Sequence, residues 1–200
     1  MATPLFQAPK GTRDVLAPES TRQRALVECF ARFARDAAFG EIETPIFEDR
    51  GVFERIGQST DVVSKEMYDF EDKDGRALAL RPELTASVVR AFLQHRPLTP
   101  WRAWYEGPQF RYEKPQAGRY RQFTQVGVEI IGTDDPQADV EIIALAWRFF
   151  EAIGLRQVTL LLNSLGDPTC RPAYLEALET YLRDRAGDLS EQSRATLDAN

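Results

Sequence analysis

Apolar residues recur at helical spacing in the first part of the chain. They lie three or four positions apart, as on one face of a helix: Leu26, Phe30, Phe33 and Ala37. Ser20 or Thr21 is suited to cap the start of this helix, and Gly40 is suited to end it. The pattern therefore predicts a helix from about residue 21 to residue 39.

The pattern changes from helical to alternating after this helix. Residues 41–47 alternate between polar and apolar side chains, which is typical of a strand. Pro45 has no backbone N–H to donate, so we expect this strand at the edge of a sheet or at an interface. Residues 67–70 and 77–80 flank a turn at 72–75 that contains Asp and Gly, and they predict a β-hairpin.

Helical and extended patterns follow one another through the rest of the chain. Helices are predicted from Pro82 and Glu83 onward, from 134–136 to about 153, and from Pro168 onward with Leu175, Leu178, Tyr181 and Leu182 facing inward. Extended segments are predicted at 101–105, 109–112, 121–131 and 158–162, with a loop at 114–119. Hairpins mixed with helices, without regular βαβ alternation, favour an α+β fold with an antiparallel sheet flanked by helices.

The strand predicted at 121–131 has two different faces, because side chains alternate across a strand. One face carries Gln122, Thr124, Val126, Val128 and Ile130. The other face carries Arg121, Phe123, Gln125, Gly127 and Glu129. A cation, an aromatic ring, an amide, an empty position and a carboxylate therefore lie in a row, with room at the glycine for a substrate to lie on the strand.

A solvated outer face is the alternative explanation for this row. A solvated face does not account for the aromatic side chain of Phe123. It also does not account for Gly127, because glycine weakens a strand. Arg111 and Glu113 share one parity in the preceding segment, so a hairpin would add them to the same floor. The sequence therefore predicts a polar binding floor.

The loop between these two segments is basic within an acidic chain. Net charge is -6, whereas the loop contributes Lys114, Arg119 and Arg121, with Gln116 among them. Such a cluster suits a polyphosphate or the end of a nucleic acid, although an ordinary charged hairpin tip has the same composition.

The remaining composition narrows the class of protein. The N-terminus has no apolar signal core and no apolar run is long enough to span a bilayer, so we expect a cytoplasmic protein with no membrane contact. Cys29 and Cys170 are the only cysteines and His95 is the only histidine, so we expect no metal site built from such residues.

Several blocks of the sequence resemble class II aminoacyl-tRNA synthetases, most closely histidyl-tRNA synthetases. Residues 110–113, 118–123 and 127–129 resemble motif 2 in its histidyl form, and residues 21–46 resemble motif 1. Residues 10–14 and 80–85 resemble the family's opening and its amino-acid-binding segment. Residues 163–174 resemble another histidyl-type block. The blocks occur in the family's order over nearly the whole chain.

The resemblance implies a fold and a reaction. Residues 1–200 would be the N-terminal portion of a class II catalytic domain with a six-stranded type of antiparallel sheet, forming a homodimer through motif 1. Motif 3 and the anticodon-binding domain would lie after Asn200. The implied enzyme is a histidine–tRNA ligase, which uses ATP with Mg²⁺ to activate L-histidine and transfers it to tRNA(His).

The resemblance also implies roles for individual residues. Arg111 would be the catalytic residue and would bind both the ATP α-phosphate and the histidine carboxylate. The other ATP-binding residues would be Glu113, Phe123 and Arg121, with Phe123 stacked on adenine. The other histidine-binding residues would be Glu83, Thr85, Gln125 and Glu129, with Glu129 at the imidazole. The loop facing tRNA would carry Lys114, Gln116, Arg119 and Arg121.

One residue departs from the family's pattern. Leu84 stands where bacterial synthetases commonly have glycine. An inactive synthetase-like paralogue, the regulatory subunit of ATP phosphoribosyltransferase in histidine biosynthesis, often has leucine at this place. A regulatory subunit is therefore the alternative to the enzyme, and a downstream anticodon-binding domain would distinguish the two.

Overall fold

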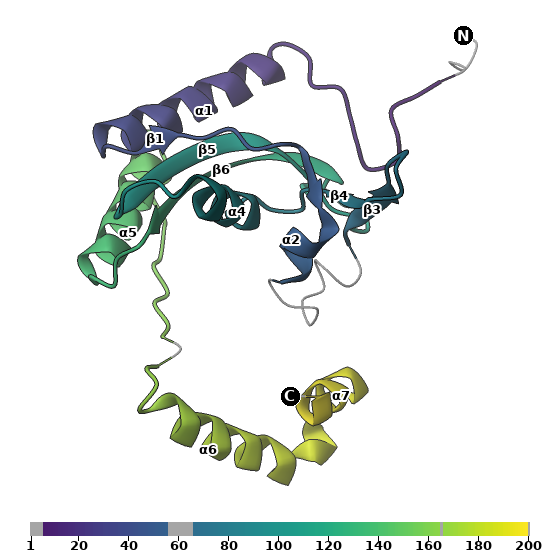
Figure 1. Cartoon of the computed structure of the whole chain (residues 1–200), viewed down its shortest axis with the longest axis vertical. Helices are drawn as coiled ribbons and strands as arrows, with labels where there is room; N and C mark the ends of the chain where they lie inside the picture. Colours follow the sequence, from purple (N-terminus) through teal and green to yellow (C-terminus); the bar gives the residue numbers. More distant parts are fainter. Residues whose placement is uncertain (1–5, 56–65, 165, 200) are drawn as a thin grey trace. The chain divides into compact units, whose positions relative to one another are not determined.

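The computed structural model describes residues 6–55, 66–164 and 166–199 (Figure 1). The chain forms two compact units, residues 1–156 and residues 157–200. Among the described residues, none of the helices combines the length and the apolar character needed to cross a membrane.

Helices and short sheets make up the first unit. Its elements are α1 (Glu19–Asp36), β1 (Gly40–Glu41), β2 (Phe47–Asp49), α2 (Arg50–Glu54), β3 (Tyr68–Glu71), β4 (Ala77–Leu80), α4 (Thr85–His95), β5 (Trp101–Phe110), β6 (Gln122–Ile131) and α5 (Gln137–Ala152). The described strands form two three-stranded sheets, with strand orders β1-β5-β6 and β2-β4-β3. All pairs are antiparallel except that of the two-residue strand β1 with β5, which is parallel. The α+β fold with an antiparallel sheet flanked by helices is thus confirmed, with β1 as a short parallel addition.

The sheet formed by β1, β5 and β6 is covered by helices on both faces (Figure 1). On one face, Trp104 of β5 belongs to a core cluster with side chains of α1 and α5, such as Phe30 and Phe149. On the other face, Ala103 and Tyr105 of β5 belong to a cluster with Leu84 and Val88 from the start of α4. The alternation along β5 therefore separates a purely structural face from the face that α4 approaches.

The strand predicted at 41–47 is broken into two strands in different sheets. β1 pairs with β5 and β2 pairs with β4, while residues 42–46 pass between the sheets. Pro45 lies in this crossing and belongs to neither strand. Its carbonyl and that of Thr44 accept hydrogen bonds from the Arg81 guanidinium, which holds the crossing without a β ladder.

Other predicted elements agree with the structure apart from their limits. The hairpin, the loop, α4, α5 and β6 lie where they were predicted. Residues 101–105 and 109–110 of the two predicted extended segments belong to the single strand β5, and residues 111–112 lie beyond its end. The predicted cap of α1 was wrong. The helix already begins at Glu19, behind Pro18, and has no side-chain cap, so Ser20 and Thr21 lie in its first turn.

The second unit contains the helix predicted from Pro168 onward, but it differs from the prediction at residues 158–162 and in the burial of this helix. It contains α6 (Arg171–Asp184), the 3-10 helix η1 (Ala186–Asp188) and α7 (Glu191–Ala199). Residues 158–162 form no strand, and Leu161 is 89% exposed. None of the described residues of α6 is buried, including the four predicted to face inward. The described part of this unit contains no strand, and Leu178 and Leu182 are partly buried while Leu175 and Tyr181 are exposed.

Candidate active site

The two faces of β6 differ as the alternation predicts. Val126, Val128 and Ile130 pack against the core cluster formed with α1 and α5. Glu129 and Gly127 lie opposite Ala103 and Tyr105 of β5, on the face that α4 approaches. The polar row is therefore a partly buried floor beside the start of α4, and the alternative of a solvated outer face is wrong.

Glu129 is held by donors from two other elements. The hydroxyl of Thr85, the first residue of α4, donates to Glu129 Oε1 over 2.8 Å. The phenol of Tyr105 donates to the same oxygen over 3.2 Å. The structure thus brings together two predicted histidine-binding residues, Thr85 and Glu129, and adds Tyr105, which the sequence analysis missed.

Gly127 does not leave an open space for a substrate, contrary to the expectation. Tyr105 is its direct partner in the ladder, and a Cβ added at Gly127 would overlap the Tyr105 ring and hydroxyl. The missing side chain is therefore the space through which Tyr105 reaches Glu129. Only the register of β5 against β6 reveals this pairing, and the sequence pattern does not contain that register.

The environment of Tyr105 keeps its hydroxyl protonated. The side chain is buried, at 3% exposure. Burial is the main cause that raises the Tyr105 pKa, and the negative charge of Glu129 raises it further. The phenol therefore remains a hydrogen-bond donor to the carboxylate throughout the neutral range.

Arg111 connects the segment before α4 to the floor of β6. Its Nε donates to the Pro82 carbonyl over 2.9 Å, and its guanidinium carbon lies 5.2 Å from the centre of the Phe123 ring. Its Nη1 and Nη2 atoms have no hydrogen-bond partner within the described chain. Two nitrogen atoms of a fixed, always charged fork are therefore available to anionic oxygens.

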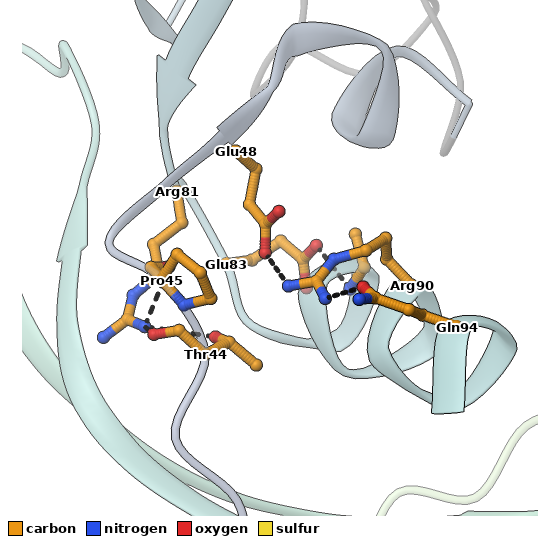
Figure 2. Close-up of polar contacts among 8 residues, drawn as sticks. Thr44, Pro45, Glu48, Arg81, Glu83, Arg90 and Gln94 are labelled. Atoms are coloured by element: carbon orange, nitrogen blue, oxygen red, sulfur yellow. Dashed lines mark hydrogen bonds and ion pairs between the residues drawn. The ribbon is translucent and has the colours of Figure 1, made fainter. Parts of the chain in front are cut away.

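Glu83 lies between two arginines at the start of α4 (Figure 2). Its Oε1 accepts a hydrogen bond from the backbone N–H of Ala86 over 2.9 Å, which fixes the carboxylate on the first turn. The charge of Glu83 also contributes to the raised pKa of Tyr105. The Gln125 side-chain amide, on the same floor, has no hydrogen bond within the described chain.

Arg81 precedes Pro82 and Glu83 and fixes them by hydrogen bonds to neighbouring backbone carbonyls. Its Nη1 donates to the Thr44 carbonyl over 2.8 Å (Figure 2). Its Nε donates to the Pro108 carbonyl over 3.0 Å. Arg81 is only 3% exposed, and burial lowers its pKa from the ordinary value. A Cβ at Gly107 would overlap its guanidinium. The residue that immediately precedes Pro82 and Glu83 is thus fixed to both sheets.

A second arginine anchors α4 on its other side. Arg90 forms an ion pair with the buried carboxylate of Glu48 over 2.5 Å, and its Nη1 donates to Gln94 over 3.0 Å (Figure 2). Glu48 belongs to β2, the strand that follows the crossing at Pro45. The position of α4, and with it that of Glu83 and Thr85, depends on both arginines.

The basic loop is held by contacts at its base. Arg119 forms an ion pair with Glu113 over 3.0 Å. Arg121 Nε donates to the Glu113 carbonyl over 3.1 Å, and the Arg121 guanidinium lies 3.7 Å from the centre of the Tyr112 ring. Lys114 is exposed. Glu113 and Arg121 therefore shape the loop, in addition to any contact with ATP.

Residues near the N-terminus cross this loop, which the sequence analysis did not predict. The Gly11 carbonyl accepts a hydrogen bond from the Arg121 backbone N–H over 2.7 Å. The Arg13 guanidinium lies 4.6 Å from the centre of the Tyr120 ring, and Gln116 pairs with Arg119 at the tip of the loop. Contacts between such distant residues leave no periodic signal in the sequence.

Comparison with known proteins identifies the family. A family model described as histidyl-tRNA synthetase matches residues 11–186. The chain belongs to the histidyl-tRNA synthetase family. It is 52% identical over 196 residues to a histidine–tRNA ligase of Corynebacterium kroppenstedtii, covering 96% of this chain and 46% of that protein. It is 50% identical over 201 residues to a histidine–tRNA ligase of Geobacillus thermodenitrificans, covering 98% of this chain and 47% of that protein. The chain therefore spans about half the length of these curated relatives.

Solved structures of the family support the fold. The apo histidyl-tRNA synthetase of Staphylococcus aureus matches with a TM-score of 0.77 and 34% identity, over 96% of this chain and 46% of that chain. A Bacillus halodurans C protein described as an ATP phosphoribosyltransferase regulatory subunit/histidyl-tRNA synthetase matches with a TM-score of 0.66 and 28% identity, over 78% and 40%. The α+β class expected from the sequence is thus the fold of a histidyl-tRNA synthetase core.

Leu84 has a packing role in this synthetase core. It is 1% exposed and belongs to the same cluster as Val88, Ala103 and Tyr105. The departure from the family's common glycine therefore places a large apolar side chain under the site. Packing in this core cluster is sufficient to explain the presence of leucine at position 84.

A hollow of about 740 Å³ lies beside the predicted site of the synthetase core. Its lining comes mainly from α2, α4 and the residues next to them, and of the predicted site residues only Glu83 and Thr85 line it. Arg111, Gln125 and Glu129 lie on the floor of β6 and do not line it. No cluster of three or more His, Cys, Asp or Glu side chains suited to a metal ion occurs within the described residues.

Proposed function

We propose that this chain carries the N-terminal part of the catalytic domain of a histidine–tRNA ligase. The proposed enzyme activates L-histidine with ATP and transfers it to tRNA(His). The observation that carries the proposal is the placement of Arg111. It is fixed to Pro82, next to Glu83, while its guanidinium lies over Phe123. One arginine therefore lies between the predicted amino-acid site and the predicted adenine platform.

The first reaction needs no general base from the protein. The histidine carboxylate is ionised at neutral pH and attacks the α-phosphorus of ATP, which releases pyrophosphate. Catalysis then depends on positioning and on neutralising the charge that develops on the phosphoryl oxygens. Arg111 is suited to this role because Nη1 and Nη2 have no partner within the described chain. Mg²⁺ would accompany the triphosphate and neutralise its remaining charge.

The substrates' polar groups match the groups on the floor. Glu83, Thr85 and Gln125 are proposed to hold the α-amino group of histidine, because a buried ammonium needs a carboxylate and further acceptors. Glu129 is proposed to accept from the imidazole N–H. Phe123 is proposed to stack on adenine, with Glu113 and Arg121 as the other ATP-binding residues at the base of the loop.

The second reaction joins histidine to tRNA. A ribose hydroxyl at the tRNA end attacks the adenylate carbonyl and releases AMP. Lys114, Gln116, Arg119 and Arg121 lie in the loop beside the floor, and we propose that this loop guides the acceptor end.

Assembly and location follow from the same proposal. The enzyme would be a cytoplasmic homodimer whose partner contacts involve motif 1, which spans α1 and the crossing at Pro45. The comparisons do not favour the regulatory-subunit alternative. Relatives at 50–52% identity are named histidine–tRNA ligases, and Leu84 is accounted for by packing.

Histidine-dependent exchange of labelled pyrophosphate into ATP tests the proposal. We would measure it on the 200-residue chain, and on a chimera in which the remaining residues of the Geobacillus relative follow the chain. We expect exchange in the chimera, and a fall of roughly 100-fold in Arg111→Ala, because one charge-stabilising group is lost. Arg148→Ala, on the exposed side of α5, is the matched control and should keep full activity. No exchange in either form would reject the enzyme and favour the regulatory subunit.

A further inference from the structure

One oxygen of Glu129 receives both of its hydrogen bonds. Thr85 and Tyr105 donate to Oε1 over 2.8 and 3.2 Å. Oε2 has no partner within the described chain. The two donors come from α4 and β5, so the carboxylate of β6 is fixed from two directions.

The position of Tyr105 leaves its hydroxyl little freedom. The ring crosses the space above Gly127, its direct ladder partner, and lies in the apolar cluster that contains Leu84 and Val88. A buried phenol needs a polar partner for its hydroxyl, and Glu129 supplies it. The tyrosine therefore points at Glu129 by packing, before any substrate binds.

We propose that Tyr105 is a positioning residue for histidine recognition. Together with Thr85 it saturates Oε1 of Glu129 and leaves Oε2 as the single free acceptor for the imidazole N–H. This inference rests on the proposed function and adds a residue to it.

Fixing one carboxylate oxygen has a consequence for specificity. A freely rotating carboxylate can form hydrogen bonds with donors in many positions. A fixed carboxylate forms one only with a donor that is placed opposite Oε2. An amino acid without an N–H at that place leaves Oε2 buried and unpaired, which is the situation that gives strong discrimination in binding sites. Tyr105 would thus contribute to rejection of other amino acids without touching the substrate.

A double-mutant cycle in the active chimera tests this role. We expect Tyr105→Phe to raise the KM for histidine about tenfold, the effect of one charge-assisted hydrogen bond, with little change in the KM for ATP. In the Glu129→Gln background, Tyr105→Phe should add almost nothing, because it acts through the carboxylate. Tyr181→Phe, on exposed α6, is the matched control for loss of a phenol hydroxyl. Thermal unfolding would verify that each variant is folded.

The outcomes are distinguishable. Wild-type exchange with an unchanged histidine KM in Tyr105→Phe would overturn the inference and leave the proposed function intact. Equal effects on the KM for histidine and for ATP, or full additivity with Glu129→Gln, would show a general structural role and would also overturn it. Absence of exchange in the wild-type chimera would reject the proposed function and this inference together.

Discussion

Arg81 shows how a single charged side chain can organise the surroundings of a site that it does not enter. Its guanidinium donates to carbonyls of the crossing and of β5, and its backbone N–H donates to the Ile46 carbonyl over 3.0 Å. A buried charge is stable only when such partners surround it. Arg81 therefore fixes the segment that leads into α4, while Arg90 anchors the helix itself.

Arg81→Ala should lower the free energy of unfolding by about 3 kcal/mol, because several buried carbonyls lose their donor. Urea unfolding followed by circular dichroism measures the change. Arg76→Ala is the control, since its side chain is 69% exposed in the β3–β4 hairpin and its ion pairs are solvated. An equally large loss in both variants would contradict the role given to burial.

At the scale of elements, local patterns predicted more than distant contacts did. The strand β6 was predictable because its alternation reflects one face packed on the core with α1 and α5 and one polar face toward α4. The interruption between β1 and β2 at Pro45 was not predictable. Arg81, whose side chain holds this crossing, directly follows β4 and is distant in sequence. The strand expected at 158–162 was wrong because an apolar run needs a neighbouring strand, and sequence does not show whether one exists.

The same distinction applies to the site. Alternation brought Phe123, Gln125 and Glu129 to one face, and the family resemblance added Thr85, which the structure places against Glu129. Tyr105 was missed because its role follows only from the register opposite Gly127. The binding roles of these residues stay predictions until exchange is measured.

Gly11 links the N-terminal segment to the basic loop, and its replacement should loosen that loop. In Gly11→Ala, a Cβ would lie 2.7 Å from Arg121 side-chain carbons at a φ of +85°. We expect trypsin to cleave after Arg119 roughly tenfold faster, because cleavage follows the population of the open loop. Mass spectrometry of the digest measures this rate.

Gly75→Ala is a closely matched control for the Gly11 substitution. Its φ is +78°, and a Cβ there would meet nothing within 4 Å. The two variants thus share the backbone strain of a left-handed residue but only one displaces a neighbour. Equal cleavage rates in the two would show that Gly11 contributes conformation alone, without the contact to Arg121.

At the scale of the whole molecule, the basic loop differs in sign from the net charge of the chain. The chain carries a net charge of -6, so its overall field repels nucleic acid. The basic loop is where attraction to phosphates can exceed that repulsion. If tRNA binds through this loop, its affinity should fall strongly as the salt concentration rises, and a few basic residues should account for it.

Lys114→Ala should reduce the slope of log affinity for tRNA against log salt concentration by about one, the loss of one phosphate contact. Filter binding over a series of salt concentrations measures the slope. Lys73→Ala is the control, because Lys73 is also an exposed lysine in a hairpin turn but lies in the other sheet. A slope that is unchanged in Lys114→Ala would move the RNA contact away from this loop.

The contact between Arg81 and Gly107 also restricts the order in which the two positions can change. A Cβ at position 107 would overlap the guanidinium, so a substitution there requires Arg81 to move away from the carbonyls that it binds. Shortening Arg81 first opens the space but removes the hydrogen bonds that hold the crossing. Replacing both together relieves the overlap but still loses these hydrogen bonds, so arginine at 81 and glycine at 107 should be retained as a pair in an evolving lineage or a design project.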